Sequence, residues 1–269
     1  MNESVEPILK WAGGKRQLLG ELLPLVPDYK GKYIEPFMGG GAMFFALSPE
    51  TAVLSDCNEE LITLYKTVSK HPEQVIEELK KYKNTEKEYY RIRVLDWKSL
   101  SEVEAAARMI FLNKTGFNGL YRVNRQGGFN VPYGKNKRTQ FCNEEQILKA
   151  AKVLKKKKLL CDDYKRILKK YAEPGDFIFL DPPYFQVTER EIFLRYTSDR
   201  FYEPDQEELA EMVNDLYDMG CEVMMTNSNH PRIYELYSRF DIKVVQVHRA
   251  VNCKGDGRKG EDTIITAFH

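Results

Sequence analysis

Short apolar runs alternate along the chain with segments whose apolar residues recur at helical spacing. This alternation is typical of an α/β fold. The run 177–180 is apolar throughout, as expected of a central parallel strand that is covered on both faces. The same pattern predicts seven strands, at 32–36, 51–55, 159–161, 177–180, 222–226, 242–247 and 263–268. We therefore expect a mostly parallel sheet with helices on both faces.

Segments of helical periodicity lie between these strands. They predict one helix that opens at Ala42 and others at about 59–70, 72–82, 101–113, 143–158, 205–217 and 231–240. Ser101 followed by Glu104 is the capping-box pattern that starts a helix. Residues 114–140 interrupt the periodicity and carry six basic residues and no acidic ones. Aromatic and branched residues alternate on both sides of Arg125-Gln-Gly-Gly128, which predicts a β-hairpin over about 115–134.

A glycine-rich junction, Glu35-Pro-Phe-Met-Gly-Gly-Gly41, connects the first strand to the following helix. Glycines there allow the backbone to approach a ligand closely, at the sheet edge where α/β folds bind ligands. A tight structural turn explains the glycines alone about equally well, and their spacing fits neither a phosphate loop nor a dinucleotide fingerprint. Asp56, at the end of the next strand, adds a carboxylate that can bind both hydroxyls of a ribose. The pair indicates a nucleoside-type cofactor without a pyrophosphate.

The sequence Asp181-Pro182-Pro183-Tyr184 directly follows the strand 177–180. An Asp-Pro pair alone is usually an ordinary turn. Two consecutive prolines fix two φ angles and remove two N–H groups, so the Asp181 carboxylate and the Pro182 carbonyl can face one spot as rigid acceptors. Such acceptors can hold a planar amino group and localise its lone pair toward an electrophile. Tyr184 could stack on the base that carries the amine.

The segment Lys10-Trp11-Ala-Gly-Gly-Lys15 precedes the first strand. A functional interpretation places Lys15 near a cofactor carboxylate and Trp11 against the apolar or cationic part of the same molecule. A solvated lysine beside a structural tryptophan is the alternative interpretation. The residue types alone do not decide between them.

The net charge of +1 argues at first against a simple polyanion binder. Residues 108–170, however, hold 17 Lys/Arg and four Asp/Glu, a net charge of +13, which leaves 24 against 36, or −12, for the remainder. Basic residues supply phosphate contacts, and Arg is the usual reader of guanine. A solvated loop would explain the charge of 114–140 but not the interleaved aromatic residues. The lysine-rich segment 149–158 could extend the same face, or could be a solvated helix.

Other features restrict the class of protein. The cysteines Cys57, Cys142, Cys161, Cys221 and Cys253 are odd in number and lack a C-x-x-C pair, which predicts reduced, mostly buried thiols in a cytoplasmic protein. The four histidines are scattered, so no metal site is expected. The first ten residues lack the apolar core of a signal peptide, and no apolar run approaches the ~20 residues of a membrane span. We expect a soluble cytoplasmic protein with no membrane partner.

Together these segments resemble the Dam-like family of site-specific DNA adenine-N6 methyltransferases. The motifs KWAGGK, EPFMGGGA, SDCNEELI, FNGLYR, GGFNVPYG, FIFLDPPY and TNSN occur in the family's order over nearly the whole chain. The resemblance implies a Rossmann-like methyltransferase sheet with helices on both faces, in which residues 1–56 and 159–269 form the catalytic domain. It implies that the inserted residues 57–158, helices plus the β-hairpin, recognise DNA. S-adenosylmethionine is the implied cofactor, and double-stranded DNA at 5′-GATC the implied substrate.

The resemblance also implies roles for single residues. Trp11 and Lys15 match contacts to the methionine end of the cofactor, and Asp163 matches an adenine contact. The implied cofactor site as a whole comprises Trp11, Lys15, Phe37, Gly39, Gly41, Asp56, Asp163 and Asp181. The residues Asp181, Pro182, Pro183 and Tyr184 match the clamp for the target adenine and are the implied catalytic residues.

The implied DNA contacts lie mainly in the hairpin. Phe117 and Asn118 correspond to the pair that enters the space left by a flipped base, and Phe117 stands where some members have Tyr. Lys10 matches a contact to the first base. The full implied set is Lys10, Phe117, Asn118, Leu120, Arg122, Pro132, Tyr133, Lys135, Lys137 and Arg138, of which Leu120, Arg122 and Pro132 match base readers.

Two alternatives remain open at this point. The same fold and cofactor could act on an RNA guanine amine, because DPPY also occurs in such enzymes, although the hairpin favours DNA. A DNA-binding relative that has lost catalysis is a second alternative, disfavoured by the presence of Lys15, Asp56 and Asp181. A monomer is expected, with a cognate restriction endonuclease as a candidate genetic partner.

Overall fold

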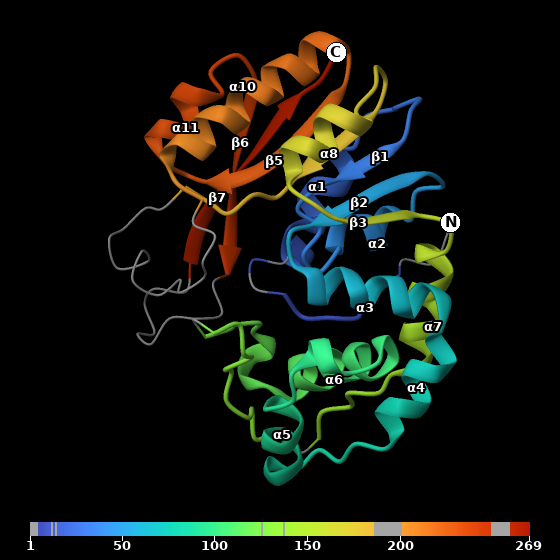
Figure 1. Cartoon of the computed structure of the whole chain (residues 1–269). Coiled ribbons are helices and arrows are strands. Elements are labelled where there is room, and N and C mark those ends of the chain that lie inside the picture. The colour runs from blue at the N-terminus through green and yellow to red at the C-terminus, as the bar shows by residue number, and fades with distance from the viewer. Residues whose placement is uncertain are drawn as a thin grey trace.

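A seven-stranded sheet forms the centre of the computed structural model, which describes residues 5–11, 13, 15–124, 126–136, 138–185, 201–248 and 259–269 (Figure 1). The strand order is β3-β2-β1-β4-β5-β7-β6. Strands β1 to β5 pair in parallel, and β7 lies antiparallel between β5 and β6. The strands are β1 (Tyr33–Glu35), β2 (Ala52–Asp56), β3 (Lys158–Cys161), β4 (Phe177–Leu180), β5 (Glu222–Ser228), β6 (Asp241–His248) and β7 (Lys259–Ala267). All seven predicted strands are confirmed.

Alternate residues of the central strands face two separate hydrophobic clusters. In β4, Phe177 and Phe179 pack into one cluster, whereas Ile178 and Leu180 pack into the other, and all four are buried. The first cluster includes residues of α1 (Leu19–Leu22), α2 (Ala42–Leu47) and α3 (Glu59–Lys70). The second includes residues of α8 (Tyr164–Tyr171), α10 (Glu203–Met219) and α11 (Pro231–Leu236). Helices therefore cover both faces of the sheet, as predicted.

Most residues between β2 and β3 build a second helical layer, which lies below the sheet in Figure 1 with α3 between them. Its helices are α4 (Pro72–Lys80), α5 (Glu86–Arg93), α6 (Glu102–Thr115) and α7 (Glu144–Leu154). The capping box of Ser101 and Glu104 is present at the start of α6. Single 3-10 turns complete the described elements, at Lys15–Leu18, Leu23–Leu25, Trp97–Ser99 and Phe117–Gly119. The division of the chain into a catalytic domain and a recognition region stays a prediction.

Residues 115–134 double back as predicted, but they do not form regular strands. Two isolated antiparallel bridges join Gly116 to Tyr133 and Val123 to Phe129. Backbone hydrogen bonds support the second bridge, from Asn124 N–H to the Gly128 carbonyl (2.8 Å) and from Asn130 N–H to the Arg122 carbonyl (2.9 Å). The β-hairpin prediction is therefore corrected to an irregular loop over residues 115–134, which we call the recognition loop after its predicted role.

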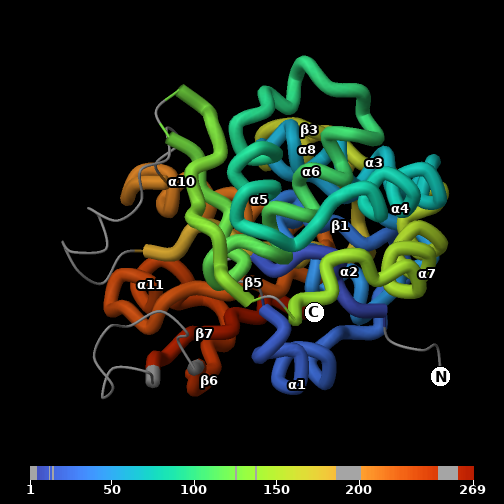
Figure 2. Tube along the Cα trace, turned by 90° about the horizontal axis from the view of Figure 1, so that it is seen from below, coloured from blue at the N-terminus to red at the C-terminus, as the bar shows by residue number. Residues whose placement is uncertain are grey.

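The lysine-rich helix is shorter than predicted and lies away from the recognition loop. Helix α7 ends at Leu154, Lys156 adopts a left-handed φ of 66°, and Lys158 begins β3. In both views the recognition loop lies on the side that carries α11 and β7, and α4 and α7 lie on the opposite side (Figures 1 and 2). The segment 149–158 therefore does not extend the face of the recognition loop.

Cysteine burial also differs from the prediction. Of the four described cysteines only Cys221 is buried, whereas Cys57 and Cys161 are exposed and Cys142 is half-buried. Cys253 lies outside the described residues. Among the described residues, no helix combines the length and apolar character needed to cross a membrane.

Candidate active site

The carboxyl ends of β1, β2 and β4 meet at one edge of the sheet and enclose a cavity of about 370 Å³. That volume is within the usual range for small-molecule sites. The wall combines the glycine-rich junction after β1, the end of β2, the tip of β4 and the segment before the first 3-10 turn. The lining residues are Trp11, Gly13, Lys15, Glu35, Phe37, Met38, Gly39, Gly40, Gly41, Ala42, Met43, Asp56, Cys57, Phe179, Asp181, Pro182, Pro183 and Tyr184.

The glycine-rich junction lies directly against Trp11. Gly39 adopts a left-handed φ of 46°, and a Cβ atom there would lie 2.8 Å from the Trp11 ring, so only glycine fits. The Gly39 N–H donates to Asp56 Oδ2 (2.9 Å), and the Asn58 N–H donates to Asp56 Oδ1 (2.9 Å). Burial raises the pKa of Asp56 above its usual value, against the effect of these donors. The structure thus brings together Trp11, the glycines and Asp56, which are far apart in sequence.

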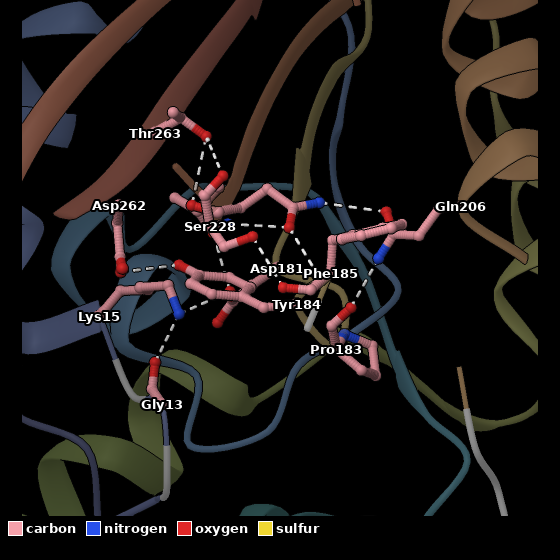
Figure 3. A network of polar contacts seen from close by, with 12 residues as sticks. Gly13, Lys15, Asp181, Pro183, Tyr184, Phe185, Gln206, Ser228, Asp262 and Thr263 are labelled. Atoms are coloured by element: carbon pink, nitrogen blue, oxygen red, sulfur yellow. Dashed lines mark hydrogen bonds and ion pairs between the residues drawn. The ribbon is translucent and has the colours of Figure 1, made fainter. Parts of the chain in front are cut away.

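Asp181 stands at the tip of β4 and is held through one carboxylate oxygen. Lys15 Nζ lies 2.6 Å from Asp181 Oδ1, and the Thr226 hydroxyl donates to the same oxygen (2.8 Å; Figure 3). Within the described part of the chain, Asp181 Oδ2 and the Pro182 carbonyl accept no hydrogen bond, and both residues line the cavity. Two acceptor atoms of cavity-lining residues therefore have no partner among the described residues, and that both face one spot stays a prediction.

Lys15 is nearly buried, with 7% of its side chain exposed. Its ammonium also donates to the Gly13 carbonyl (2.6 Å) and lies 4.5 Å from the centre of the Tyr184 ring. The ammonium therefore neutralises Asp181 at the floor of the cavity. The predicted contact of Lys15 with a cofactor carboxylate stays a prediction.

Neighbouring elements hold the segment after Asp181 from behind (Figure 3). From α10, the Gln206 side chain donates to the Pro183 carbonyl (2.9 Å). From β7, Asp262 accepts a hydrogen bond from the Tyr184 hydroxyl (3.0 Å). Burial raises the pKa of Tyr184 well above its usual value, so the phenol stays neutral and keeps donating. Helix α10 and strand β7 therefore hold Pro183 and Tyr184 of the DPPY segment.

Of two residues in the predicted cofactor site, Phe37 lines the cavity and Asp163 does not. Phe37 lines the cavity, and its ring packs against Tyr164 with 4.9 Å between ring centres. Asp163 does not line the cavity; its Oδ1 accepts from the Lys165 N–H (2.9 Å) and caps α8. The cofactor role of Asp163 stays a prediction, and its structural role is that of a helix cap.

The predicted DNA contacts lie mostly at the surface of the recognition loop. Phe117 is 48% exposed, and Asn118 next to it is exposed with a left-handed φ of 54°. Lys10 and Pro132 are exposed, and Leu120 is half-buried. The Pro132 carbonyl accepts from the Phe117 N–H (2.9 Å), which fixes the base of the turn. The structure thus presents an aromatic ring and a carboxamide side by side.

Other predicted DNA contacts divide into exposed and buried side chains. Arg122 is exposed, and its guanidinium donates to the side chain (2.7 Å) and the carbonyl (3.3 Å) of Asn130. Lys135 and Arg138 are exposed, and Lys137 lies outside the described residues. Tyr133 is only 7% exposed and donates its hydroxyl to Asn84 (2.8 Å). Because its side chain packs inside the helical layer, we leave Tyr133 out of the proposed contacts.

Sequence reasoning missed several residues of the site. Glu35 lines the cavity, is 2% exposed and accepts from the Tyr33 hydroxyl (2.8 Å). Burial is the main cause that raises the pKa of Glu35 to about 8. Thr226 on β5 and Asp262 on β7 were given no role. Thr226 begins the TNSN motif, but the sequence does not indicate which strands lie beside β4, so their contacts with Asp181 and Tyr184 could not be predicted. A carboxylate at the end of an apolar strand was the available signal for Glu35.

Comparisons with known proteins identify the family of the chain. The model of the family described as D12 class N6 adenine-specific DNA methyltransferase matches residues 11–251. The chain belongs to this family. It is 38% identical to the type II methyltransferase M1.LlaDCHI of Lactococcus lactis subsp. cremoris, over 98% of this chain and 96% of that protein. It is 39% identical to the type II methyltransferase M.MjaIII of Methanocaldococcus jannaschii, over 95% and 96%. It is 30% identical to the DNA adenine methylase of Escherichia coli, over 97% and 94%.

Membership of this family implies S-adenosylmethionine as the methyl donor, and the cavity can be tested against it. A nucleoside that carries an amino acid and a sulfonium needs a ribose acceptor, a surface for a flat base and a charged end. Asp56 and Phe37 line the same cavity as Trp11 and Lys15, and these four residues offer such groups. The residues present therefore fit the donor that the family implies.

Proposed function

We propose that the protein transfers the methyl group of S-adenosylmethionine to the N6 amine of adenine within double-stranded DNA, at 5′-GATC, after flipping the base out of the helix. One observation carries the proposal. The Asp181 carboxylate, with Oδ1 held by Lys15 and Thr226, stands beside the Pro182 carbonyl at the wall of a cofactor-sized cavity.

The cofactor would be held by the cavity lining. Asp56 would accept the ribose hydroxyls, the backbone of Gly39 and Gly41 would allow close approach, and Trp11 and Lys15 would face the methionine end. When bound, the cofactor supplies an electrophilic methyl group on a sulfonium.

The residues of this chain would orient the adenine amine. Its lone pair is conjugated into the ring and is a poor nucleophile. Two acceptors, Asp181 Oδ2 and the Pro182 carbonyl, would take its two N–H bonds and localise the lone pair on the nitrogen. Asp181 would act mainly as an acceptor, and the proton would leave after methyl transfer. This is catalysis by orientation and electrostatic stabilisation.

An adenine within a duplex cannot reach a buried acceptor pair, so the base must leave the stack at a cost of roughly a few kcal/mol. Phe117 and Asn118 are exposed on the recognition loop and would occupy the vacated space, which offsets part of this cost. Tyr184, whose ring lies at the cavity, would stack on the flipped base. Lys135, Lys137 and Arg138 would contact DNA from residues 57–158, which would act as the recognition region, and Lys10 would contact it from the N-terminal segment.

The target sequence is supported by the named DNA adenine methylases among the relatives and by the exposed Arg122, whose guanidinium is held by Asn130. Arg held in this way is suited to reading guanine in the major groove. Leu120 and Pro132 would contact neighbouring bases. Two relatives are named type II methyltransferases, which supports a cognate restriction endonuclease as a genetic partner. The active form would be a monomer.

The function is tested by incubating the protein with genomic DNA and labelled S-adenosylmethionine and then reading modified adenines by single-molecule sequencing. The expected result is N6-methyladenine at GATC and nowhere else. Methylation at another site would correct the target while keeping the reaction. Label in an RNA substrate, with none in DNA, would refute the proposed substrate. The Asp181→Ala variant serves as the inactive control.

A further inference from the structure

Asn113, near the end of α6, is fully buried (0% exposed), and its carboxamide makes three hydrogen bonds. Its Oδ1 accepts from the Lys10 N–H (2.9 Å). Its Nδ2 donates to the Lys10 carbonyl (2.7 Å) and to the Gly119 carbonyl (3.0 Å). Both N–H groups and the oxygen are therefore used. One side chain joins Lys10, 103 residues earlier in the sequence, to the recognition loop.

The two segments that Asn113 joins serve the two halves of the proposed reaction. On one side, Trp11 follows Lys10 and lines the cavity. It packs closely against the glycine-rich junction, because a Cβ atom added at Gly40 would lie 2.9 Å from the Cβ of Trp11. On the other side, Gly119 ends the turn that presents Phe117 and Asn118. The segment at Asn113 therefore lies between the wall of the cavity and the turn that would enter DNA.

Close packing accompanies these hydrogen bonds. Gly119 has a left-handed φ of 64°, and a Cβ there would lie 2.6 Å from Lys10 Cβ, so the backbone of the turn lies directly on Lys10. Further along the two segments, the rings of Trp11 and Tyr121 stack with 5.2 Å between centres and 23° between planes. The Tyr121 hydroxyl donates to Glu60 (3.0 Å), which pairs with the buried Arg108 (2.6 Å). The distance between turn and cavity is thus fixed at two successive points.

We propose that Asn113 is a positioning residue that couples base extrusion to the cofactor cavity, by holding the turn Phe117–Gly119 at a fixed place relative to Trp11. The inference rests on the proposed base-flipping function. Asn113 contacts neither the cavity nor the exposed face of the loop, and it acts through Lys10 and Gly119. Because the turn and the cavity are held at a fixed distance, insertion of the turn into DNA also places the adenine at Asp181.

This role predicts a defect that depends on the pairing of the target base. Asn113→Leu keeps the approximate volume but leaves the Lys10 N–H and two carbonyls without their buried partner, so the turn shifts. Extrusion of a paired adenine needs the turn in place. An adenine opposite an abasic site is already partly unstacked and needs less help. A merely structural role would slow both substrates alike.

The experiment compares single-turnover methylation of two duplexes that differ only in what stands opposite the target adenine, thymine or an abasic site. For Asn113→Leu we expect a loss of roughly ten- to a hundredfold on the paired target. On the unpaired target and in S-adenosylmethionine affinity by calorimetry, we expect less than about a threefold change. Fluorescence of 2-aminopurine at the target position reports extrusion directly. In Asn113→Leu on the paired duplex, this signal should be lower than in the wild type, in parallel with the methylation rate.

A second variant protects the test against misfolding. Gly119→Ala leaves the Asn113 carboxamide intact but places a methyl group against Lys10, and it should give the same pairing-dependent loss. The matched control is Asn84→Leu, which removes an asparagine that anchors Tyr133 at the other end of the recognition loop. Any loss in that control should be equal on the two duplexes.

The outcomes separate the two proposals. Absence of a 2-aminopurine signal with the wild-type protein refutes base flipping itself. A normal wild-type signal, together with equal losses or no losses on the two duplexes in Asn113→Leu and Gly119→Ala, overturns the role of Asn113 alone. If Asn113→Leu fails to bind the cofactor, Gly119→Ala decides the result.

Discussion

The cavity edge of the sheet and the recognition loop hold their functional groups in different ways. At the cavity, side chains are fixed by other side chains: Asp181 by Lys15 and Thr226, and Tyr184 by Asp262. In the recognition loop the backbone is held, by two isolated bridges and the Asn113 carboxamide, while Phe117 and Asn118 extend into solvent.

The difference fits the roles that we propose for the two regions. Orientation of a reacting amine requires acceptors that are already in place, because reorganisation would raise the barrier. Contact with DNA requires groups whose partners belong to another molecule, so those side chains have few partners within the chain. A polar group held by its own fold is therefore a candidate for chemistry, and an exposed group on a held backbone is a candidate for recognition.

The largest expected effect is at the cavity. Asp181→Ala should lower the methylation rate by 10²–10³-fold or more, because the amine loses a rigid acceptor. S-adenosylmethionine affinity by calorimetry should be largely retained, since the ribose and base contacts remain. The control Asp162→Ala removes an acidic side chain on the surface that pairs with Arg166, and should be neutral. Near-normal turnover of Asp181→Ala would contradict the proposal that Asp181 orients the reacting amine.

The second effect concerns stability at the same edge. The pKa of Glu35 rises from an ordinary 4.5 to about 8 on folding, so the folded state holds a proton that the unfolded chain releases. Stability from this group is fully present below about pH 4.5 and falls as the pH rises toward 8, by at most ~1.4 kcal/mol per unit. Glu35→Gln keeps an acceptor for Tyr33 and should remove that slope.

The measurement is the free energy of unfolding in urea at several pH values between 5 and 9. The difference between wild type and Glu35→Gln isolates the group, because all other titrations are shared. Glu211→Gln, an exposed carboxyl on α10, is the matched control. Parallel curves for wild type and Glu35→Gln would mean that Glu35 is ionised in the folded protein.

The third effect tests the recognition loop. Arg122→Ala should reduce discrimination at its guanine by about 1–3 kcal/mol while the rate at saturating DNA stays close to normal. Competition between GATC and singly substituted duplexes measures it. Arg138→Ala should instead weaken all duplexes alike and reduce the salt slope by about one. If Arg122→Ala leaves the specificity profile unchanged, the loop holds DNA without reading it at this residue.

The smallest effect concerns how firmly Asp181 must be held. Thr226→Val keeps the shape and removes the hydroxyl donor to Oδ1, which should lower the single-turnover rate roughly fivefold, as for loss of one hydrogen bond of ~1 kcal/mol. Thr67→Val, which removes a buried hydroxyl bonded within α3, should leave the rate unchanged. No change in Thr226→Val would show that Lys15 alone suffices.

The strands were predictable because a parallel sheet needs continuous apolar runs, as in 177–180. Helix α5 was missed because only Tyr89 and Ile92 are buried on it, so its pattern is almost wholly polar. Helix α8 was also missed, although Tyr164, Ile167, Leu168 and Tyr171 recur at helical spacing and predict it. The predicted hairpin did not form regular strands, since glycines and the left-handed Asn118 interrupt any ladder.

The site was predictable where one motif carries its own geometry, as in Asp181 to Tyr184 and the glycines before α2. It was not predictable where function depends on contacts between distant segments. Neither the donation of Thr226 to Asp181 nor the link from Asn113 to Lys10 leaves a local signal. The burial of Tyr133 could not be predicted either. An aromatic residue among basic ones is equally suited to a DNA-binding surface or to a hydrophobic core.

The position of β7 has a consequence for how the enzyme is made. This strand is the last element along the chain, yet it lies between β5 and β6 and supplies Asp262 to Tyr184 and Thr263 to the backbone of Asn227. During synthesis the DPPY segment therefore leaves the ribosome long before its support does. We expect a nascent chain to carry the proposed catalytic motif without being able to use it, and methylation to begin only after β7 has docked.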